Sequence, residues 1–362
     1  MNISSDLQGI GLALQWASKG MYSTAPNPRV GCVIVREGQV IGAGYTLPAG
    51  QAHAEVQALR DVAERGADVR GATVYVTLEP CSHFGRTPPC ADALIQAGVG
   101  RVVAAVGDPN PLVAGQGMAK LRAAGIETVC GVLEREATEM NIGFFSRMQR
   151  SRPWVRMKAA ASLDGKTALH NGQSQWITSA AARVDGHYWR ARACAILTGV
   201  GTVKADNPQL NVRAVETPRQ PQRIIVDSAL QIDPDARVLQ GGAWIVAAQP
   251  DAEKEAVLRA RGAEVIMLPN HRGKVDLPAL MRELGRRQIN ELHVEAGHKL
   301  NGSLIREACV DELLLYLAPD LLGDGQGMFD LPALDSLSNR HKLAFHEVTQ
   351  IDTDLRILAR FI

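Results

Sequence analysis

Three side chains in the first third of the sequence combine metal-binding chemistry with a nearby carboxylate. His53 and Glu55 are separated by one residue, and Cys81 and Cys90 follow with eight residues between them. One imidazole and two thiolates supply three ligands and leave a fourth tetrahedral position open, which is typical of catalytic zinc. Water bound there loses a proton near neutral pH. Glu55 is close enough to carry that proton without binding the metal.

The spacing matches the zinc deaminase signature only in part. That signature is His-x-Glu followed by Pro-Cys-x-x-Cys, whereas eight residues separate the two cysteines here. Two other interpretations stay open at this point. Both cysteines could be core residues, or they could belong to a structural zinc site with His83 as the fourth ligand.

Two glycine-containing runs in the second half of the chain could bind an anion. The first is Leu197–Lys204 and the second is Val294–Ser303, which carries Lys299 between a predicted strand and a predicted helix. Glycines and backbone amides at a helix N-terminus form an anion site. The first run lacks the third glycine of a dinucleotide-binding fingerprint, so two ordinary turns are the alternative.

The elements that must position these residues alternate in a readable order. Before residue 147 we predict helices at 6–17, 53–65, 90–98, 118–125 and 134–145, and strands at 30–35, 40–44, 73–78, 102–106 and 127–130. Glu37-Gly38 indicates a hairpin turn. Gly98 suits a helix C-cap. This order predicts a three-layer α/β/α sandwich.

A short polar segment, Arg147–Pro153, separates this series from a second one. We therefore predict two domains, residues 1–147 and 153–362. The second has predicted strands at 154–160, 195–197, 223–226, 244–247, 264–268, 291–294, 312–317, 343–348 and 356–359. Its predicted helices cover 179–191, 252–261, 277–287 and 301–308. The last three strands have no helix between them, which predicts a mixed sheet.

The composition excludes several classes of protein. Lys and Arg total 39 against 38 Asp and Glu, and aromatic residues make up 4%. This balance disfavours a nucleic-acid-binding surface. Six cysteines are too few for a disulfide scaffold. Without a signal peptide or an apolar run of about 18 residues, we expect a cytoplasmic enzyme that does not enter a membrane.

Longer motifs around the first constellation resemble the bifunctional deaminase–reductase family of riboflavin biosynthesis. They are Asn27–Gly31, His53–Val56, Thr77–Cys90 and Asp108–Gly115. The resemblance implies a cytidine-deaminase-like domain in which His53, Cys81 and Cys90 bind Zn²⁺ and Glu55 is catalytic. It implies that Asn27, His83, Arg86 and Asn110 contact a phosphorylated diaminopyrimidine, which is deaminated to a uracil. Arg86 and Thr46 depart from the family, which often has Lys and His there.

The second half carries the rest of the resemblance, in Lys158–Lys166, Ser174–Ser179, Gly201–Pro208 and Val294–Ser303. It implies a dihydrofolate-reductase-like domain that uses NADPH to reduce the ribosyl group to ribityl. The implied cofactor contacts are Ala160, Trp176, Thr202, Asp206, Ser228, Gly297, His298, Lys299, Leu300, Asn301, Gly302 and Ser303. The implied substrate contacts are Ser174, Arg190, Leu210, Arg213 and Glu295, with both arginines suited to the phosphate.

The proton-handling group of the reductase is left open between Lys158, Glu295 and Asp206, with the first two preferred. Asp164 is expected to be structural. A homo-oligomer is expected from the resemblance. The competing hypotheses are a nucleoside or nucleic-acid deaminase with a C-terminal binding domain, which the neutral charge disfavours, and a non-catalytic zinc scaffold.

Overall fold

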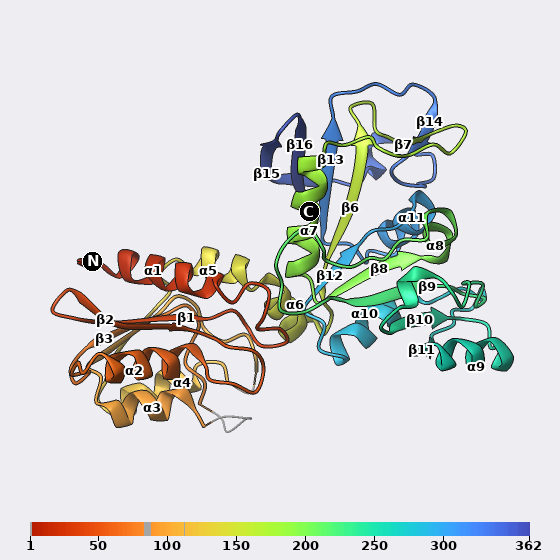
Figure 1. The fold of residues 1–362 in the computed structure, drawn as a ribbon. Helices are drawn as coiled ribbons and strands as arrows, with labels where there is room; N and C mark the ends of the chain where they lie inside the picture. The colour runs from red at the N-terminus through yellow and green to blue at the C-terminus, as the bar shows by residue number, and fades with distance from the viewer. Residues whose placement is uncertain (1, 83–87, 112) are drawn as a thin grey trace. The chain divides into compact units, whose positions relative to one another are not determined.

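The chain forms two compact units, Met1–Ser151 and Arg152–Ile362. The computed structural model describes residues 2–82, 88–111 and 113–362. Each unit is built around its own sheet (Figure 1). Within the described ranges, no helix has both the length and the apolar character needed to cross a membrane.

The first unit contains a five-stranded sheet in the order β2-β1-β3-β4-β5. Strand β1 pairs antiparallel with both β2 and β3, whereas β3, β4 and β5 are parallel. The strands are β1 (Gly31–Arg36), β2 (Gln39–Tyr45), β3 (Thr73–Val76), β4 (Arg101–Ala104) and β5 (Glu127–Cys130). Glu37 and Gly38, both at positive φ, form the predicted hairpin turn.

Helices cover both faces of this sheet, so the predicted three-layer sandwich is confirmed (Figure 1). On one face lie α1 (Asp6–Ser18) and α5 (Glu134–Met140). On the other lie α2 (Ala54–Glu64), α3 (Cys90–Ala97) and α4 (Gln116–Ala123). Glycines bring α2 very close to β2, since a Cβ built on Gly44 would lie 2.6 Å from the Ala58 nitrogen. This close approach fixes the start of α2, where His53 and Glu55 lie.

The prediction of one helix over 134–145 is wrong in one respect, because the helix is interrupted at Asn141. There α5 ends and α6 (Ile142–Arg150) begins. The Asn141 side chain is buried, and it accepts a hydrogen bond from the Arg29 nitrogen at 2.7 Å and donates to the Arg29 oxygen at 2.9 Å. A distant backbone segment thus competes with the helix for this residue. Helix α6 also continues through residues 147–150, which the sequence suggested as linker.

The second unit contains a nine-stranded sheet in the order β11-β10-β9-β8-β12-β6-β13-β16-β15. The strands from β11 to β13 are parallel, whereas β16 and β15 are antiparallel, so the predicted mixed sheet is confirmed. The strands are β6 (Trp154–Ser162), β8 (Ala195–Gly199), β9 (Gln222–Val226), β10 (Ala243–Ala247), β11 (Ala263–Met267), β12 (Glu291–Val294), β13 (Glu312–Ala318), β15 (Leu343–Ile351) and β16 (Asp354–Phe361). Strands β7 (Lys166–Leu169) and β14 (Gly325–Gly327) form a separate ribbon.

Helices pack on both faces of this larger sheet. Side chains of α10 (Leu277–Arg286) and α11 (His298–Arg306) pack against one face, and those of α7 (Ala180–Arg192) and α9 (Ala252–Ala260) against the other. The remaining helical segments are α8 (Val200–Asp206), η1 (Arg237–Leu239) and η2 (Leu337–Asn339).

The strand order reverses once in this sheet, and such a reversal marks the expected ligand-binding crevice. From β6 the chain passes to β8 and outward to β11, then returns to insert β12 between β8 and β6. Ligands of open α/β sheets bind beyond the carboxyl ends of strands at such a reversal. The segments that follow β8 and β12 contain the two glycine runs predicted to bind an anion.

Candidate active sites

In the first unit, the predicted metal ligands come together from three separate segments. His53 precedes α2, Cys81 follows β3, and Cys90 is the first residue of α3. The Nδ1 atom of His53 lies 3.6 Å from the Cys81 sulfur and 3.3 Å from the Cys90 sulfur. All three possible ligand atoms lie within 4.8 Å of one another. This arrangement suits a single metal ion with three protein ligands.

The thiol groups of Cys81 and Cys90 form a hydrogen bond that shifts the pKa values of both. A hydrogen bond from Cys90 lowers the pKa of Cys81 to about 4, and the same bond raises the pKa of Cys90. The Cys90 backbone N–H also donates to the Cys81 sulfur at 3.3 Å. Cys81 is therefore readily a thiolate, which is the form that binds metal.

Glu55 lies in the first turn of α2 beside this group. Its side chain is almost fully buried, with 4% of the residue exposed. Burial raises the pKa of Glu55 to about 7, and the negative charge of Cys81 adds to the effect. A carboxyl group with a pKa near neutrality can both accept and donate a proton during one reaction cycle.

The predicted substrate contacts of this unit are only partly described. Asn27 and Asn110 are half-buried and lie in the loops that precede β1 and follow β4. The Asn110 nitrogen donates to Asp108 Oδ1 at 2.8 Å, which shapes its loop. His83 and Arg86 lie outside the described residues. Thr46, where the family often has His, is buried.

In the second unit, the two glycine runs meet. The Gly297 nitrogen donates to Thr202 Oγ1 at 3.1 Å, which joins the segments that follow β12 and β8. The run after β8, where no helix was predicted, forms the helix α8. The second run becomes helical at His298, three residues before the predicted start. Two helices therefore begin beside one another at this end of the sheet.

This earlier helix start changes what the predicted cofactor segment exposes. Gly297 and Lys299 are exposed at the start of α11, whereas Asn301 and Gly302 are buried. The Asn301 amide donates to the Ala296 and Met328 oxygens, and Ser303 Oγ donates to the Lys299 oxygen. The second half of the segment is thus engaged within the protein, and its first half is more exposed.

The other predicted cofactor contacts have varied surroundings. Trp176 is 69% exposed, and the Arg183 guanidinium lies 4.4 Å from the centre of its ring. Asp206 is exposed at the end of α8, and Ala160 is half-buried on β6. The Ser228 hydroxyl accepts a hydrogen bond from the Val275 nitrogen at 3.3 Å. His298 and Leu300 are half-buried in the first turn of α11, and the Leu300 side chain lies close to Gly199.

The predicted substrate residues include a tight ion pair. The Arg190 guanidinium donates to both oxygens of Glu295, at 2.5 and 2.8 Å, and to the Asn211 oxygen at 3.0 Å. Arg213 is exposed and donates to Asn211 Oδ1. Of the two arginines, Arg213 is therefore the one whose guanidinium has most donors available for a phosphate.

Two further predicted contacts offer different groups. The side chain of Leu210 is buried in the core, and its backbone has φ +48°. Its backbone is thus the part that could meet a ligand, and such strained positions cluster at functional sites. Ser174 is half-buried in the segment between β7 and α7.

Two ionisable groups, the half-buried Lys158 and the buried His293, interact with the Arg190–Glu295 pair. Burial lowers the pKa of the Lys158 ammonium, and the charge of Glu295 partly opposes that shift. His293, missed from the sequence, is fully buried on β12, with Nε2 3.2 Å from Glu295 Oε1. Its two-residue spacing from Glu295 on a predicted strand was the available signal, because such residues share a face.

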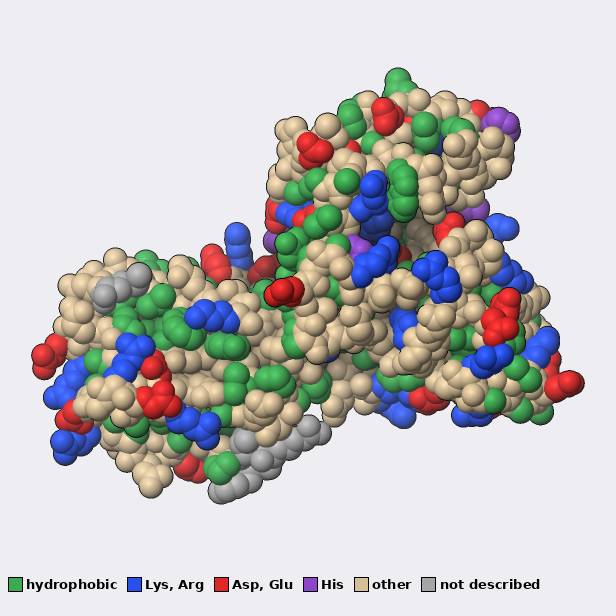
Figure 2. All heavy atoms as spheres, in the orientation of Figure 1, with side chains coloured by type: hydrophobic (Ala, Val, Ile, Leu, Met, Phe, Trp, Pro, Cys, Tyr) green, Lys and Arg blue, Asp and Glu red, His purple; other side chains and the backbone are tan. Residues whose placement is uncertain are grey.

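A second histidine, His187, was also missed. Its Nδ1 accepts a hydrogen bond from the Arg213 nitrogen at 3.3 Å. Burial, together with the charges of Arg190 and Arg213, lowers the pKa of His187 to about 4. The spacing of three residues between His187 and Arg190 on one predicted helix was the signal that could have found it. Figure 2 shows a hollow in this unit bordered by Lys and Arg side chains.

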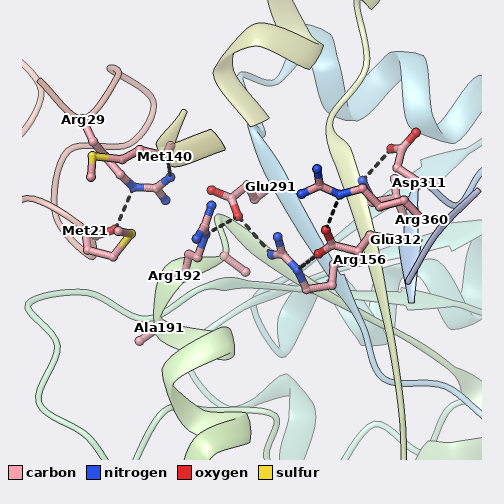
Figure 3. A network of polar contacts seen from close by, with 12 residues as sticks. Met21, Arg29, Met140, Arg156, Ala191, Arg192, Glu291, Asp311, Glu312 and Arg360 are labelled. Atoms are coloured by element: carbon pink, nitrogen blue, oxygen red, sulfur yellow. Dashed lines mark hydrogen bonds and ion pairs between the residues drawn. The ribbon is translucent and has the colours of Figure 1, made fainter. Parts of the chain in front are cut away.

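At the opposite ends of the strands lies a buried network of charges that the sequence did not indicate (Figure 3). Arg156 on β6 donates to Glu312 at 2.5 Å and to Glu291 at 3.1 Å. Arg192 and Arg360 bind the same two carboxylates from α7 and β16. Since these groups begin β12 and β13, they fix the register of the sheet and lie away from its ligand-binding end.

Comparison with known protein families matches both units. Residues 4–106 match the family described as the cytidine and deoxycytidylate deaminase zinc-binding region. Residues 153–357 match the RibD C-terminal domain.

Individual relatives match over nearly the whole chain. The riboflavin biosynthesis protein RibD of Escherichia coli K12 is 46% identical, covering 95% of this chain and 96% of its own length. RibD of Haemophilus influenzae is 45% identical, covering 95% and 94%. Among solved structures, Acinetobacter baumannii RibD superposes with a TM-score of 0.89 at 40% identity, covering 99% of each chain. A Thermotoga maritima diaminohydroxyphosphoribosylaminopyrimidine deaminase/5-amino-6-(5-phosphoribosylamino)uracil reductase has the same TM-score at 34% identity, again covering 99% of each chain.

Proposed function

Because this chain belongs to the RibD family of bifunctional riboflavin biosynthesis enzymes, with a zinc-binding deaminase domain and a reductase domain, we propose which of its side chains carry each reaction. The observation that supports the proposal most strongly is the convergence of His53, Cys81 and Cys90 beside the buried carboxyl group of Glu55. A metal scaffold has no use for that carboxyl group, whereas hydrolytic deamination requires a proton carrier there.

In the deaminase, His53, Cys81 and Cys90 hold Zn²⁺, and Glu55 moves protons. Zinc, when bound, supplies a Lewis acid that makes water nucleophilic at neutral pH. Glu55 takes a proton from the water that attacks C2 of the pyrimidine and passes one to the amine that leaves. A carbon–oxygen bond forms, the carbon–nitrogen bond breaks, and ammonia and the uracil are the products.

The deaminase substrate is 2,5-diamino-6-(5-phosphoribosylamino)pyrimidin-4(3H)-one, held by Asn27, His83, Arg86 and Asn110. The half-buried amides of Asn27 and Asn110 suit the donors and acceptors on the edge of a pyrimidine. Arg86 offers a planar fork to the phosphate. A chain with a net charge of +1 is better suited to such a small metabolite than to nucleic acid.

In the reductase, NADPH binds at the crevice beyond β8 and β12. Gly297 allows close approach, Thr202 fixes that glycine, and the start of α11 with Lys299 favours phosphate groups. Ala160, Trp176, Asp206, Ser228 and the other residues of Gly297–Ser303 complete the proposed cofactor site. NADPH, when bound, supplies the hydride that reduces C1′ of the ribosyl group.

Among the three ionisable candidates, Lys158 is the proton donor of the reductase. The lowered pKa of its ammonium brings it toward the range in which it gives up a proton readily. The Arg190 charge holds the pKa of Glu295 well below its ordinary value, so Glu295 stays ionised and orients substrate. Asp206 is exposed at the end of α8. Lys158 gives its proton to the ring oxygen of the ribose as its bond to C1′ breaks.

The remaining substrate contacts are Ser174, Leu210, Arg213 and the Arg190–Glu295 pair, with Arg213 as the main phosphate ligand. We also infer a homo-oligomer. Edge strand β15 is exposed along most of its length, and its Phe345 is 76% exposed. An uncovered edge with large apolar side chains favours pairing with another chain. Size-exclusion chromatography with light scattering tests this, and a strictly monomeric protein would contradict it.

Mass spectrometry of the products tests the proposed function. With zinc and the diaminopyrimidine phosphate, the enzyme should release ammonia and form the uracil. Addition of NADPH should convert the ribosyl group to ribityl, with one NADPH consumed per product. If the uracil intermediate supports no NADPH consumption, the reductase assignment fails. If no ammonia appears with zinc bound, the deaminase assignment fails.

A further inference from the structure

Glu79 is a buried carboxylate that none of the roles above uses. It lies two residues before the proposed zinc ligand Cys81, and only 3% of the residue is exposed. A carboxylate that has left water needs compensating hydrogen bonds, or its burial would be very costly. Glu79 obtains them from the backbone of a segment 29 to 39 residues further along the chain.

The two oxygens of Glu79 divide their contacts between two parts of that segment. Oε2 accepts from the nitrogens of Asp108 at 3.1 Å and Gly115 at 2.9 Å. Oε1 accepts from the nitrogens of Gly117 at 2.9 Å and Met118 at 3.2 Å. The first pair closes the loop that carries Asn110, and the second pair caps the first turn of α4 with a negative charge.

The contact between α4 and the Glu79–Cys81 segment is also tightly packed. A Cβ built on Gly117 would lie 1.9 Å from the Pro80 oxygen, so α4 rests directly on the backbone between Glu79 and Cys81. The loop itself is tightly turned, because Asn110 donates to Asp108 and its oxygen accepts from Val113 and Ala114. The segment that carries the proposed zinc ligand Cys81 thus fixes the position of the loop that carries Asn110.

We propose that Glu79 is a positioning residue of the deaminase, which clamps the loop segments 107–111 and 113–115 so that Asn110 meets the pyrimidine at a fixed distance from the zinc site. The inference rests on the proposed deaminase function and adds a residue to it. Glu79 touches neither substrate nor metal, and it acts through the loop. Its loss should therefore weaken substrate binding more than it slows the chemical step.

The test is Glu79→Gln in the full-length zinc-loaded enzyme. An amide keeps the size of the side chain but offers one acceptor oxygen to four N–H donors, and its NH₂ group would face two of them. We expect kcat/KM for deamination to fall by about 10²-fold, mostly through KM, with zinc content unchanged. Glu79→Asp keeps the charge but is one methylene shorter, so its kcat/KM for deamination should lie between those of the wild type and of Glu79→Gln.

The reductase reaction of the same polypeptide controls for folding, because it can be assayed on the uracil substrate. Asp6→Asn is a matched control in the same unit. Asp6 pairs with Arg101 and Tyr75, which lie outside both the Glu79 segment and the loop that carries Asn110. It should leave the deaminase KM unchanged. A wild-type enzyme that does not deaminate would refute the proposed function, whereas a wild-type KM in Glu79→Gln would refute only the clamp.

Loss of activity in proportion to lost zinc would also overturn the proposal, because Glu79 would then act through Cys81. If Glu79→Gln does not fold, Gly117→Ala tests the same contact by forcing a methyl group against Pro80. We expect the same rise in KM there, and an unchanged KM would overturn the clamp. Failure of both variants to fold would assign Glu79 to the stability of the fold and equally overturn it.

Discussion

Arg190 and Glu295 form a two-pronged ion pair, with Nε–Oε1 and Nη2–Oε2 distances of 2.5 and 2.8 Å. The pair joins α7 to the end of β12, and each side chain is about 85% buried. Sequence reasoning assigned Arg190 to the substrate phosphate. In the structure two of its N–H groups instead donate to Glu295 and a third donates to the Asn211 oxygen, so Arg190 and Glu295 act as one unit that presents an oriented carboxylate.

Glu295→Gln should therefore damage the reductase more than the loss of a single contact would suggest. It leaves the Arg190 guanidinium buried with its charge uncompensated. We expect NADPH oxidation with the uracil substrate to fall about 10²-fold in kcat/KM, while deamination stays at the wild-type rate. Glu283→Gln, which removes the ion pairs with Arg286 and Arg287 at the end of α10, is the matched control. Wild-type reduction by Glu295→Gln would contradict the assignment.

Two variants of the proposed zinc site should distinguish metal binding from proton transfer. Glu55→Gln keeps all three proposed ligands, so the protein should retain zinc and lose about 10²–10⁴-fold in deamination. Cys81→Ser removes a thiolate, so zinc content and deamination should fall together. Both variants should retain the reductase. Metal analysis beside an ammonia assay measures these outcomes, and loss of zinc from Glu55→Gln would make Glu55 a ligand.

Arg156→Met should destabilise the second unit by about 3–5 kcal/mol, because Glu291 and Glu312 would stay buried without their shared partner. Arg259→Met is the control, since its ion pair with Glu255 is half-exposed and should be worth less than about 1 kcal/mol. Denaturant unfolding of the two variants measures the difference. Equal effects would show that the buried network adds nothing beyond a surface pair.

His187 should make the second unit less stable as the pH falls below neutrality. Its pKa is about 4 in the folded chain and about 6.5 when unfolded. Between these values the unfolded chain binds the proton and the folded chain does not, so the free energy of unfolding decreases as the pH falls from about 6.5 to about 4. His187→Asn keeps an acceptor for the Arg213 N–H and should flatten this dependence. Thermal unfolding at pH 7 and pH 5 checks it, with the exposed His271→Asn as control.

Much of this protein could be predicted from short-range patterns. Gly98 ends α3 at φ +72° as expected, and the predicted helix at 6–17 matches α1, which Ser5 caps. Apolar runs and turn residues act within a few positions along the chain, so they survive without knowledge of the fold. The proposed zinc ligands have a related basis, since few roles other than metal binding bring His-x-Glu and two cysteines together.

The errors occurred where distant residues decide local structure. Asn141 breaks a predicted helix because it pairs with the backbone of Arg29. The first glycine run continues from β8 into the helix α8 (Val200–Asp206), although no helix was predicted there. In both places a tertiary contact or packing outweighs the intrinsic preference of the residues.

The sequence by itself determined the layered α/β architecture and indicated the candidate metal ligands, because these depend on residue type and on spacing along the chain. Its longer motifs indicated the two reactions through their resemblance to a known family. Only the tertiary structure decided which charged groups pair. Arg190 binds Glu295, Arg156 binds Glu291 and Glu312, and Glu79 binds the loop that carries Asn110. The physical reason is that the free energy of a buried charge depends on the groups within a few ångströms of it in space, and sequence distance does not report those neighbours.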